Sequence, residues 1–363
     1  MRILYAIQGT GNGHICRAHD IVPILSSKGE VDVLVSGIQA DINVPFPVKY
    51  VFKGLSFIFG KKGGVDLFET YKKSHVKQLV KEIRSLPVHE YDLVISDFEP
   101  VSAWACVLKN KPCISLSHQA AVLNKKSPQA RHIDPVGKAI LKVYAPSSVQ
   151  YGFHFGEYDR NIFTPVIRKE VRDAELSNKG HYTVYLPAYS DKRIISILSK
   201  CEGVEWHIFS KHFEHRIESE NIKVFPINSI DFINSMASSA GVLCGAGFET
   251  PAEALFLKKK LLVVPMKKQF EQHCNAAALA RMGVPVIKSL KEKHFDVLRN
   301  WIDSEERIEV DYPDNTVNIV EKILSAHSSS EHITDVQGND SDEFSHKDFR
   351  RLTLKRIIHK LSK

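Results

Sequence analysis

The chain opens with the stretch Ile3-Leu4-Tyr5-Ala6-Ile7-Gln8-Gly9-Thr10-Gly11-Asn12-Gly13-His14, in which an apolar run passes into a glycine-rich turn. The apolar run predicts a buried strand over residues 2–7. After the turn, apolar residues recur three or four positions apart, which predicts a helix over residues 14–28 that ends at Gly29. A strand, a turn and a helix in this order begin a βαβ unit, so we expect a parallel sheet.

Strand-like and helix-like segments alternate along most of the chain, and the alternation starts again after about residue 165. This pattern predicts an α/β protein with two Rossmann-like, doubly wound domains. Ligands of such sheets bind at the carboxyl ends of the strands, so the loops there are the places to search for chemistry. The expected divisions are domains over 1–163 and 164–326, an acidic disordered linker over 327–346 and a basic helix over 347–363.

Composition argues against several classes of protein. The 363 residues, 43% hydrophobic and 25% charged, suit two packed domains. No run of about 18 apolar residues occurs and the first apolar run is short, so we expect neither a transmembrane helix nor a signal peptide. The six cysteines show no CxxC spacing, as expected of reduced thiols in a cytoplasmic protein. The net charge of +7 comes without a basic and aromatic recognition motif, so no nucleic-acid partner is predicted.

The glycine-rich turn ends at His14. Its glycines allow a ligand close to the backbone, and the helix start offers N–H groups to an anion. The spacing is GxGxG, and Val35 and Ser36 stand where a dinucleotide site has an acidic residue, so a dinucleotide site is only weakly indicated. A tight turn explains the glycines as well as a ligand does. Because histidine titrates near neutrality, His14 is a candidate general base.

A second glycine-containing turn, Gly245-Ala246-Gly247-Phe248-Glu249-Thr250-Pro251-Ala252-Glu253, precedes a predicted helix. Thr250 as N-cap, Pro251 at the first helical position and Glu253 two residues later form a capping box. The capping box leaves the two glycines unexplained, and glycines before a helix suit a diphosphate. Whether Glu253 returns to the cap or faces a ligand stays open at this point.

A third motif, Glu271-Gln272-His273-Cys274-Asn275-Ala276, begins the helix after the predicted strand 261–264. Together with Gly9–His14 and Gly247–Glu253, this motif resembles the signatures of the MurG-like nucleotide-sugar glycosyltransferases (glycosyltransferase family 28 or 1). The resemblance spans residues 1–326 in the right order. It implies the GT-B fold, in which two Rossmann-like domains face a cleft, the N-terminal one binding the acceptor and the C-terminal one the nucleotide sugar.

The resemblance also implies residue roles. His14 would deprotonate the acceptor hydroxyl, supported by a carboxylate for which Asp97 and Glu99 are the available residues. Glu253 would accept hydrogen bonds from the ribose, while Glu271 and Gln272 would hold the donor sugar. The remaining implied contacts are the diphosphate ligands Gly247, Phe248, Glu249, Thr250 and Ser190, the base contact at Ile227, and the acceptor or loop residues Gly11, Asn12, Gly13 and His118.

The activity so implied is an inverting, metal-independent transfer of a hexose or N-acetylhexosamine, from a nucleoside-diphosphate sugar, expected to be UDP-linked, to a hydroxyl of a cell-envelope or lipid-linked glycan. The donor is a substrate, and no cofactor or metal is expected, because the only Asp-x-Asp, Asp340 and Asp342, lies in the predicted linker. Two alternatives stay open. A non-hydrolysing nucleotide-sugar epimerase would need no acceptor, and a non-catalytic binding module would turn nothing over.

The positive charge is concentrated in residues 53–84, which hold eight basic residues against three acidic ones around the apolar Leu55-Ser56-Phe57-Ile58-Phe59. Each basic residue near an anionic membrane contributes about 1 kcal/mol of attraction. The segment therefore suggests a cytoplasmic protein that docks on the inner face of the membrane, although a solvated helix face explains the charge nearly as well.

Overall fold

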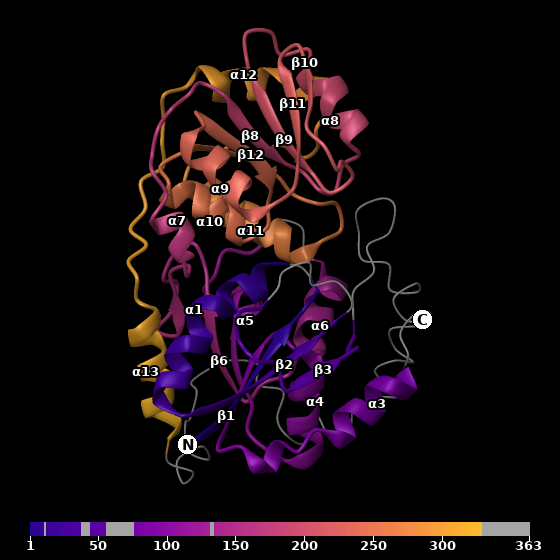
Figure 1. The fold of residues 1–363 in the computed structure, drawn as a ribbon, viewed down its shortest axis with the longest axis vertical. Helices are drawn as coiled ribbons and strands as arrows, with labels where there is room; N and C mark the ends of the chain where they lie inside the picture. Colours follow the sequence, from indigo (N-terminus) through magenta and orange to yellow (C-terminus); the bar gives the residue numbers. More distant parts are fainter. Residues whose placement is uncertain (11, 38–43, 56–75, 131–133, 329–363) are drawn as a thin grey trace. The chain divides into compact units, whose positions relative to one another are not determined.

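We describe the fold from a computed structural model, which describes residues 1–10, 12–37, 44–55, 76–130 and 134–328. The chain divides into two compact units. Of the described residues, the first unit contains those within 1–127, 135–166 and 314–328, and the second contains those within 128–134 and 167–313. Figure 1 shows both units as sheets with helices packed on them. The predicted α/β class with two doubly wound sheets is confirmed.

The first unit is built on a seven-stranded sheet of order β3-β2-β1-β4-β5-β6-β7, in which every pairing is parallel. Residues 3–7 of β1 are fully buried at the centre of this sheet, where an all-apolar strand is required. Its elements are β1 (Arg2–Gln8), α1 (Asn12–Lys28), β2 (Glu30–Ser36), β3 (Tyr50–Phe52), α3 (Val76–Ser85), β4 (Leu93–Asp97), α4 (Pro100–Lys109), β5 (Ile114–Ser117), α5 (His118–Leu123), α6 (Pro135–Tyr144), β6 (Val149–Phe153), β7 (Ile162–Phe163) and α13 (Thr316–His327).

The second unit has a six-stranded sheet of order β10-β11-β9-β8-β12-β13, parallel except for the β10–β11 pair. Trp206 and the apolar faces of α8 and α12 fill one core. The elements are α7 (Lys169–Arg172), β8 (Tyr182–Tyr185), α8 (Asp191–Leu198), β9 (Trp206–Ser210), β10 (Ile217–Ser219), β11 (Ile222–Pro226), α9 (Ser229–Ser238), β12 (Gly241–Gly245), α10 (Glu249–Phe256), β13 (Lys260–Val264), α11 (Phe270–Arg281) and α12 (Phe295–Asp303).

The C-terminal helix α13 corrects the predicted boundary at residue 326. It belongs to the first unit, where it packs beside α1 (Figure 1) and buries Ile319, Val320 and Ile323. His327 Nε2 lies 3.0 Å from the hydroxyl oxygen of Tyr151 on β6. The apolar face of α13 is therefore buried against the first unit. Of the predicted linker 327–346 and basic helix 347–363, residues from 329 onward lie outside the described residues, and His327 is the last residue of α13.

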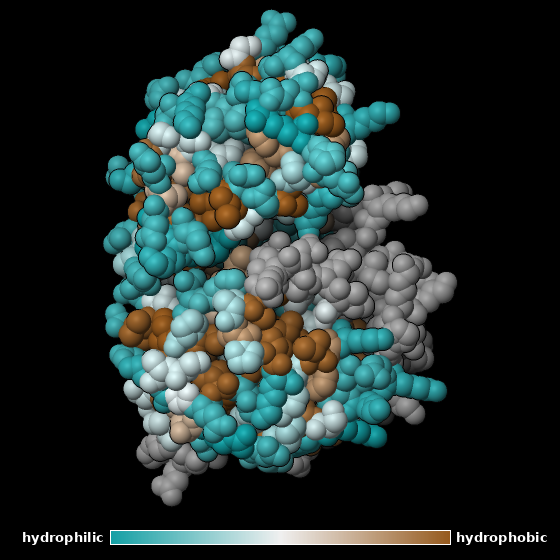
Figure 2. Space-filling model, viewed as in Figure 1, coloured by the Kyte–Doolittle hydropathy of each residue, from teal (hydrophilic) through white to brown (hydrophobic). Residues whose placement is uncertain are grey.

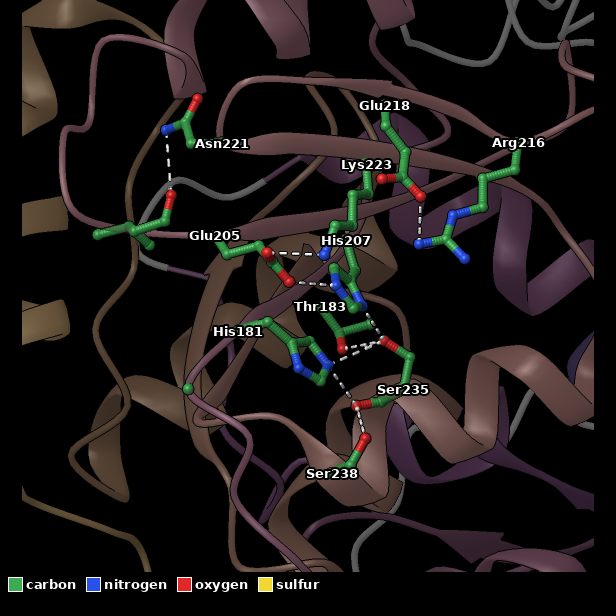
Figure 3. Close-up of polar contacts among 12 residues, drawn as sticks. His181, Thr183, Glu205, His207, Arg216, Glu218, Asn221, Lys223, Ser235 and Ser238 are labelled. Carbon is green, nitrogen blue, oxygen red and sulfur yellow. Dashed lines mark hydrogen bonds and ion pairs between the residues drawn. The ribbon is translucent and has the colours of Figure 1, made fainter.

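A polar cluster, in which His181 is buried and Glu205, His207 and Lys223 are partly exposed, lies at the amino ends of β8 and β9 (Figure 3). The rings of His181 and His207 stack with centroids 3.8 Å apart, and His181 Nε2 donates to the carbonyl of Ser235 at 3.1 Å. His207 Nε2 donates to Glu205 at 2.8 Å, and Lys223 donates to the same carboxylate at 2.7 Å. Burial, and then the neighbouring His207, lower the pKa of His181 to about 4. The cluster lies at the ends of the strands opposite to those where doubly wound sheets bind ligands, which indicates a structural role.

The surface in Figure 2 is mostly hydrophilic and is interrupted by hydrophobic patches. Within the described ranges, no helix combines the length and the apolar character needed to cross a membrane.

Candidate active site

In the first sheet β1 and β4 are neighbours, and the strand order reverses between them. The strands that follow β1, namely β2 and β3, lie on one side, and those that follow β4 lie on the other. Ligands of doubly wound sheets bind at this switch point, outside the carboxyl ends of the strands. Here β1 leads into the glycine-rich turn and α1, and β4 ends at Asp97, whose Cα pairs with that of Ile7. The fold therefore brings His14, in the first turn of α1, to the end of β4.

His14 and Asp97 form a hydrogen-bonded pair at this position. His14 Nδ1 lies 2.8 Å from Asp97 Oδ1. A proton on Nδ1 makes this hydrogen bond, and in that tautomer of the neutral ring Nε2 keeps its lone pair; a terminal nitrogen of Arg17 also lies 3.2 Å from Nδ1. The side chain of His14 is 13% exposed, whereas that of Asp97 is fully buried. Asp97 thus orients the imidazole from its Nδ1 side, while the ring stays partly exposed. This is the arrangement of a general base.

Arg17, one turn along α1, completes the cluster. Its Nε donates to Asp97 Oδ2 at 3.0 Å, and its terminal nitrogen NH2 contacts both carboxylate oxygens at 2.8 Å. Burial alone would raise the pKa of Asp97, but the charge of Arg17 and the contacts with His14 hold it below the usual value. Asp97 is therefore ionised. Sequence reasoning did not select Arg17, and the one available signal was its spacing of three residues from His14 on a helix.

Phe98 follows Asp97 and packs against the imidazole. The rings of Phe98 and His14 are nearly parallel, with centroids 6.3 Å apart, and Phe98 also stacks on Tyr144 at 4.7 Å. The φ angle of Phe98 is +56°, a conformation that bulky residues rarely adopt. Such strain is typical of functional sites, and here it places an aromatic wall beside the candidate base.

Glu99, the other carboxylate predicted to support His14, has a different role. It is the N-cap of α4, accepting from the N–H groups of Val101 and Ser102 at 2.7 and 2.6 Å, and it accepts from Ser36 Oγ at 2.6 Å. Its burial raises its pKa. Between the two candidates, the structure pairs Asp97 with His14 and uses Glu99 to begin a helix.

The other residues predicted in this unit are distributed as follows. His118 is 2% exposed, and its Nδ1 bonds the carbonyl of Phe153 at 2.8 Å, so it is packed inside the unit. Helix α1 begins at Asn12, two residues before the expected start, which places Gly13 within the helix. Gly11 lies outside the described residues. A Cβ on Gly9 would lie 3.0 Å from the carbonyl oxygen of Ser36, so the close packing against β2 favours a glycine there.

In the second unit the switch point lies between β8 and β12. The predicted capping box at Thr250 is wrong, because α10 begins at Glu249 with Phe248 as N-cap. Phe248 is buried and its carbonyl accepts from Ala252 N at 3.1 Å, so the first helical hydrogen bond forms two residues before Thr250. Pro251 still lies in the first turn, where its missing N–H is tolerated.

Gly247 lies just before α10 at the carboxyl end of β12. A Cβ added there would meet nothing within 4 Å, and its φ is not in the left-handed region, so neither packing nor backbone conformation requires glycine. Space beside a helix N-terminus suits an anionic group. Thr250 is partly exposed in this first turn, and Ser190, which precedes α8, is exposed.

Residues of the third motif, 271–276, form hydrogen bonds to two loops. Gln272 Oε1 accepts from Met266 N at 2.8 Å in the loop after β13, and Asn275 Nδ2 donates to the carbonyl of Ala246 at 3.1 Å in the turn before α10. Glu271 is partly exposed in the first turn of α11. Ile227, after β11, donates its N–H to the carbonyl of Ser210 at 2.9 Å. Helix α11 therefore ties together the loops at the carboxyl ends of β12 and β13.

Glu253 does not cap α10, and its carboxylate is not exposed to solvent. Arg168, which sequence reasoning did not select, binds both carboxylate oxygens: Nε lies 2.5 Å from Oε1 and NH2 lies 2.8 Å from Oε2. Within the described part of the chain, no cluster of three or more His, Cys, Asp and Glu side chains suits a metal ion. Asp340 and Asp342 lie outside that part.

Two doubly wound sheets define the class of this protein as GT-B, the architecture of its solved neighbours. These neighbours include the glycosyltransferase SnogD from Streptomyces nogalater (13% identity over 91% of this chain and 95% of that one, TM-score 0.52). They also include the spinosyn rhamnosyltransferase SpnG (14%, 92% and 98%, TM-score 0.52) and MnaA of S. aureus, solved with UDP (10%, 90% and 97%, TM-score 0.55). At these identities the likeness shows the fold.

Residues 1–304 match the family model of glycosyl transferase family 1, so the chain belongs to this family. The predicted superfamily and the prediction of a glycosyltransferase are thereby confirmed. No curated protein matches the chain.

Proposed function

We propose that this glycosyltransferase performs an inverting, metal-independent transfer of a hexose or N-acetylhexosamine from a UDP-sugar to a hydroxyl of a cell-envelope or lipid-linked glycan. The observation that carries the proposal is the His14–Asp97 pair at the switch point of the first sheet, 2.8 Å apart. The pair supplies one candidate base at the carboxyl ends of β1 and β4, where doubly wound sheets bind ligands. Direct displacement by an acceptor hydroxyl requires one such base.

In the proposed mechanism His14 Nε2 takes the proton of the acceptor hydroxyl as its oxygen attacks the anomeric carbon. The bond from that carbon to the nucleoside diphosphate breaks, and the diphosphate leaves with the electron pair. Asp97 stabilises the imidazolium through Nδ1–H, and Arg17 keeps Asp97 ionised in its buried position. A single displacement inverts the anomeric configuration.

We assign donor binding to the second unit, around the turn that precedes α10. Gly247 has open space for a phosphate, and Phe248, Glu249 and Thr250 form the start of α10, where N–H groups and the helix dipole favour the charge of the leaving diphosphate. The neighbouring positions Ser190, Ile227, Glu271 and Gln272 are assigned to the phosphate, base and sugar as the family signature implies.

Replacement of the base tests the proposal. General-base assistance is typically worth ~100 to 10,000-fold, so His14→Ala should lower kcat on that scale and leave UDP binding unchanged. His89→Ala is the matched control, because His89 is an exposed histidine of the same unit. Full activity of His14→Ala would refute the assignment of the base. Conversion of a UDP-sugar to an isomer without any acceptor would point to an epimerase instead.

The acceptor proposal rests on charge. Residues 53–84 hold eight basic residues against three acidic ones, and Lys53, Lys77, Lys81 and Arg84 are exposed, while residues 56–75 lie outside the described part. We infer docking on an anionic membrane that carries the acceptor. Liposome flotation should show binding to vesicles with anionic lipid and none to neutral vesicles. Equal binding to both, or to neither, would reject membrane docking.

A further inference from the structure

A cavity in the first unit lies between β3 and α3, apart from the His14–Asp97 pair. Its volume is about 620 Å³, and ligand pockets in proteins measure roughly 300–1,000 Å³. One wall consists of Val51, Phe52 and Lys53, at the end of β3, the outermost strand of the described sheet. The other wall consists of residues 78, 81, 82 and 85 of α3, which share one helix face because they are three or four positions apart. The cavity is therefore a groove between a sheet edge and a helix.

The cavity lies at the same end of the sheet as the candidate base. Gly37, which follows β2, also lines it. Gly37 N donates to the carbonyl of Phe52 at 3.1 Å, and a Cβ added to Gly37 would lie 2.7 Å from Oγ1 of Thr10, in the glycine-rich turn before His14. Strands β3, β2 and β1 are successive neighbours, so the ends of β3 and β1 are about 10 Å apart. One extended ligand can therefore reach both the cavity and His14.

The charge of the cavity lining is positive. Lys53 and Lys81 line it and are exposed, and no hydrogen bond or ion pair joins either ammonium group to the part of the chain that the structure describes. Glu82 is the one acid among the described lining residues, and it is 4% exposed. Its Oε1 accepts from Lys53 N at 3.1 Å and from Gln78 Nε2 at 3.0 Å, and its Oε2 accepts from Gly54 N at 3.0 Å. The carboxylate is thus bound by N–H donors and neutralises neither ammonium group.

The apolar part of the lining indicates what accompanies an anion. Val51 is 77% exposed and Phe52 is partly exposed, so apolar surface lies next to the two positive charges. Ligand pockets typically combine apolar walls with a few polar groups that orient the ligand. Lysine binds phosphate as a point charge. A sugar that carries a phosphate offers both an anion and the C–H groups of its ring.

We propose that this cavity binds the phosphate-bearing sugar of the acceptor, so that the acceptor is a glycosyl phosphate or diphosphate. The inference rests on the proposed function, in which His14 deprotonates the acceptor, and it names the chemical class of that acceptor. Lys53 and Lys81 bind the phosphate. Glu82 is a positioning residue, because it holds the backbone N–H groups of Lys53 and Gly54 at the end of β3. The reacting hydroxyl is then about 10 Å or more from the phosphate.

The test measures binding of a soluble glycosyl phosphate to the full-length protein. The probe is N-acetylglucosamine 1-phosphate, and methyl N-acetylglucosaminide is its uncharged counterpart. Both are titrated by ligand-observed NMR with saturating UDP, which fills the proposed diphosphate site of the second unit. The salt concentration is about 0.15 M, where exposed charges more than about 8 Å apart are largely screened from each other.

The double variant Lys53→Gln/Lys81→Gln should weaken binding of the phosphate probe ~10-fold or more, because charge-assisted hydrogen bonds are lost, and should not change binding of the uncharged sugar. The matched control is Lys77→Gln/Arg84→Gln, which removes two exposed charges of α3 outside the cavity lining and should keep the wild-type affinity. Equal weakening in both double variants would overturn the proposal. So would a wild type that does not prefer the phosphate probe to the uncharged sugar.

Circular dichroism checks the fold of each variant. Val51→Glu and Val51→Gln give a second comparison that keeps both lysines, because Val51 is exposed and lines the cavity. Val51→Glu adds a negative charge there and should weaken binding of the phosphate probe more than Val51→Gln does. Equal affinities of these two variants would overturn the proposal.

A lipid headgroup carries the same phosphate chemistry, so flotation with anionic vesicles separates the two sources. The two double variants remove equal charge and should lower flotation alike. A loss confined to Lys53→Gln/Lys81→Gln would assign the cavity to a headgroup and overturn the proposal. Failure of the proposed function has its own readout, because a wild type that binds no UDP would reject that function and the acceptor role together. UDP binding with wild-type probe affinity in Lys53→Gln/Lys81→Gln would overturn this inference alone.

Discussion

The stacked histidines at the amino end of the second sheet should make the stability of that unit depend on pH. Burial, then the neighbouring His207, lower the pKa of His181 to about 4, whereas an unfolded histidine has a pKa of about 6.5. The unfolded state therefore binds a proton at a higher pH than the folded state does. The contribution to the free energy of unfolding is complete above pH 6.5 and is lost as the pH falls from 6.5 toward 4.

The size of the effect follows from proton linkage. With pKa values of about 6.5 and 4 for the two states, the loss is about 2 kcal/mol at pH 5 and about 3 kcal/mol at pH 4. His207 acts in the same direction, because burial lowers its pKa, although Glu205 opposes this. Lys223 holds the pKa of Glu205 below its usual value, so this carboxylate costs stability only at more acidic pH. A window from pH 7.5 to 5 therefore isolates the histidines.

The assay is urea denaturation followed by tryptophan fluorescence across this window. The chain has three tryptophans, of which Trp206 and Trp301 lie in the second unit. A Trp104→Phe background removes the signal of the first unit. In this background His181→Gln, which keeps a donor near the carbonyl of Ser235, should reduce the loss of stability between pH 7.5 and 5 by about 2 kcal/mol.

The matched control is His215→Gln, because His215 is exposed in the same unit and should leave the pH dependence at the wild-type value. If His181→Gln unfolds with the same pH dependence as the wild type, the reasoning from burial and stacking is refuted.

Three further outcomes follow from the candidate site. Asp97→Asn should lower kcat by ~100-fold or more and destabilise the first unit by about 3–5 kcal/mol, because Arg17 is left buried without its counterion; steady-state kinetics and denaturation of the same sample measure both. Glu99→Gln should cost about 1 kcal/mol through the weakened cap of α4 and leave kcat at the wild-type value, and a parallel loss of activity would contradict its capping role. Gly247→Ala should change the free energy of unfolding by less than about 1 kcal/mol, because its Cβ meets no atom, while raising the donor KM; an unchanged KM would count against a phosphate at this turn.

Local patterns in the sequence were sufficient to predict most of the helices and strands. Strands β1 and β13 and helix α1 lie within one or two residues of the predicted spans, because their apolar spacing is a local property. The short strands β3, β7 and β10 and the affiliation of α13 were not predicted. Helix α13 buries apolar residues against distant parts of the chain, and its Glu321 pairs with Lys28, 293 residues away; no local pattern encodes such contacts.

The candidate site shows the same division between local and distant information. The glycine turn and His14 could be selected because they are contiguous, and Asp97 because it is a carboxylate at the end of a predicted strand. The choice between Asp97 and Glu99 could not be made, since it depends on which carboxylate points back to α1 and which caps α4. Arg17 and Arg168 were missed because an arginine in a polar sequence context is normally exposed, and only the folded chain shows the buried acids that hold them.

Both units contain a buried carboxylate paired with an arginine at the sheet edge where ligands are expected. A carboxylate with almost no exposed surface, Asp97 or Glu253, is bound through both oxygens by an arginine, so its charge can be buried. Each acid lies beside a partly exposed side chain, which is His14 in the first unit and Arg168 in the second. Removal of either acid should therefore leave an arginine without its counterion, and in the first unit it should also deprive the proposed base, His14, of its hydrogen-bond partner.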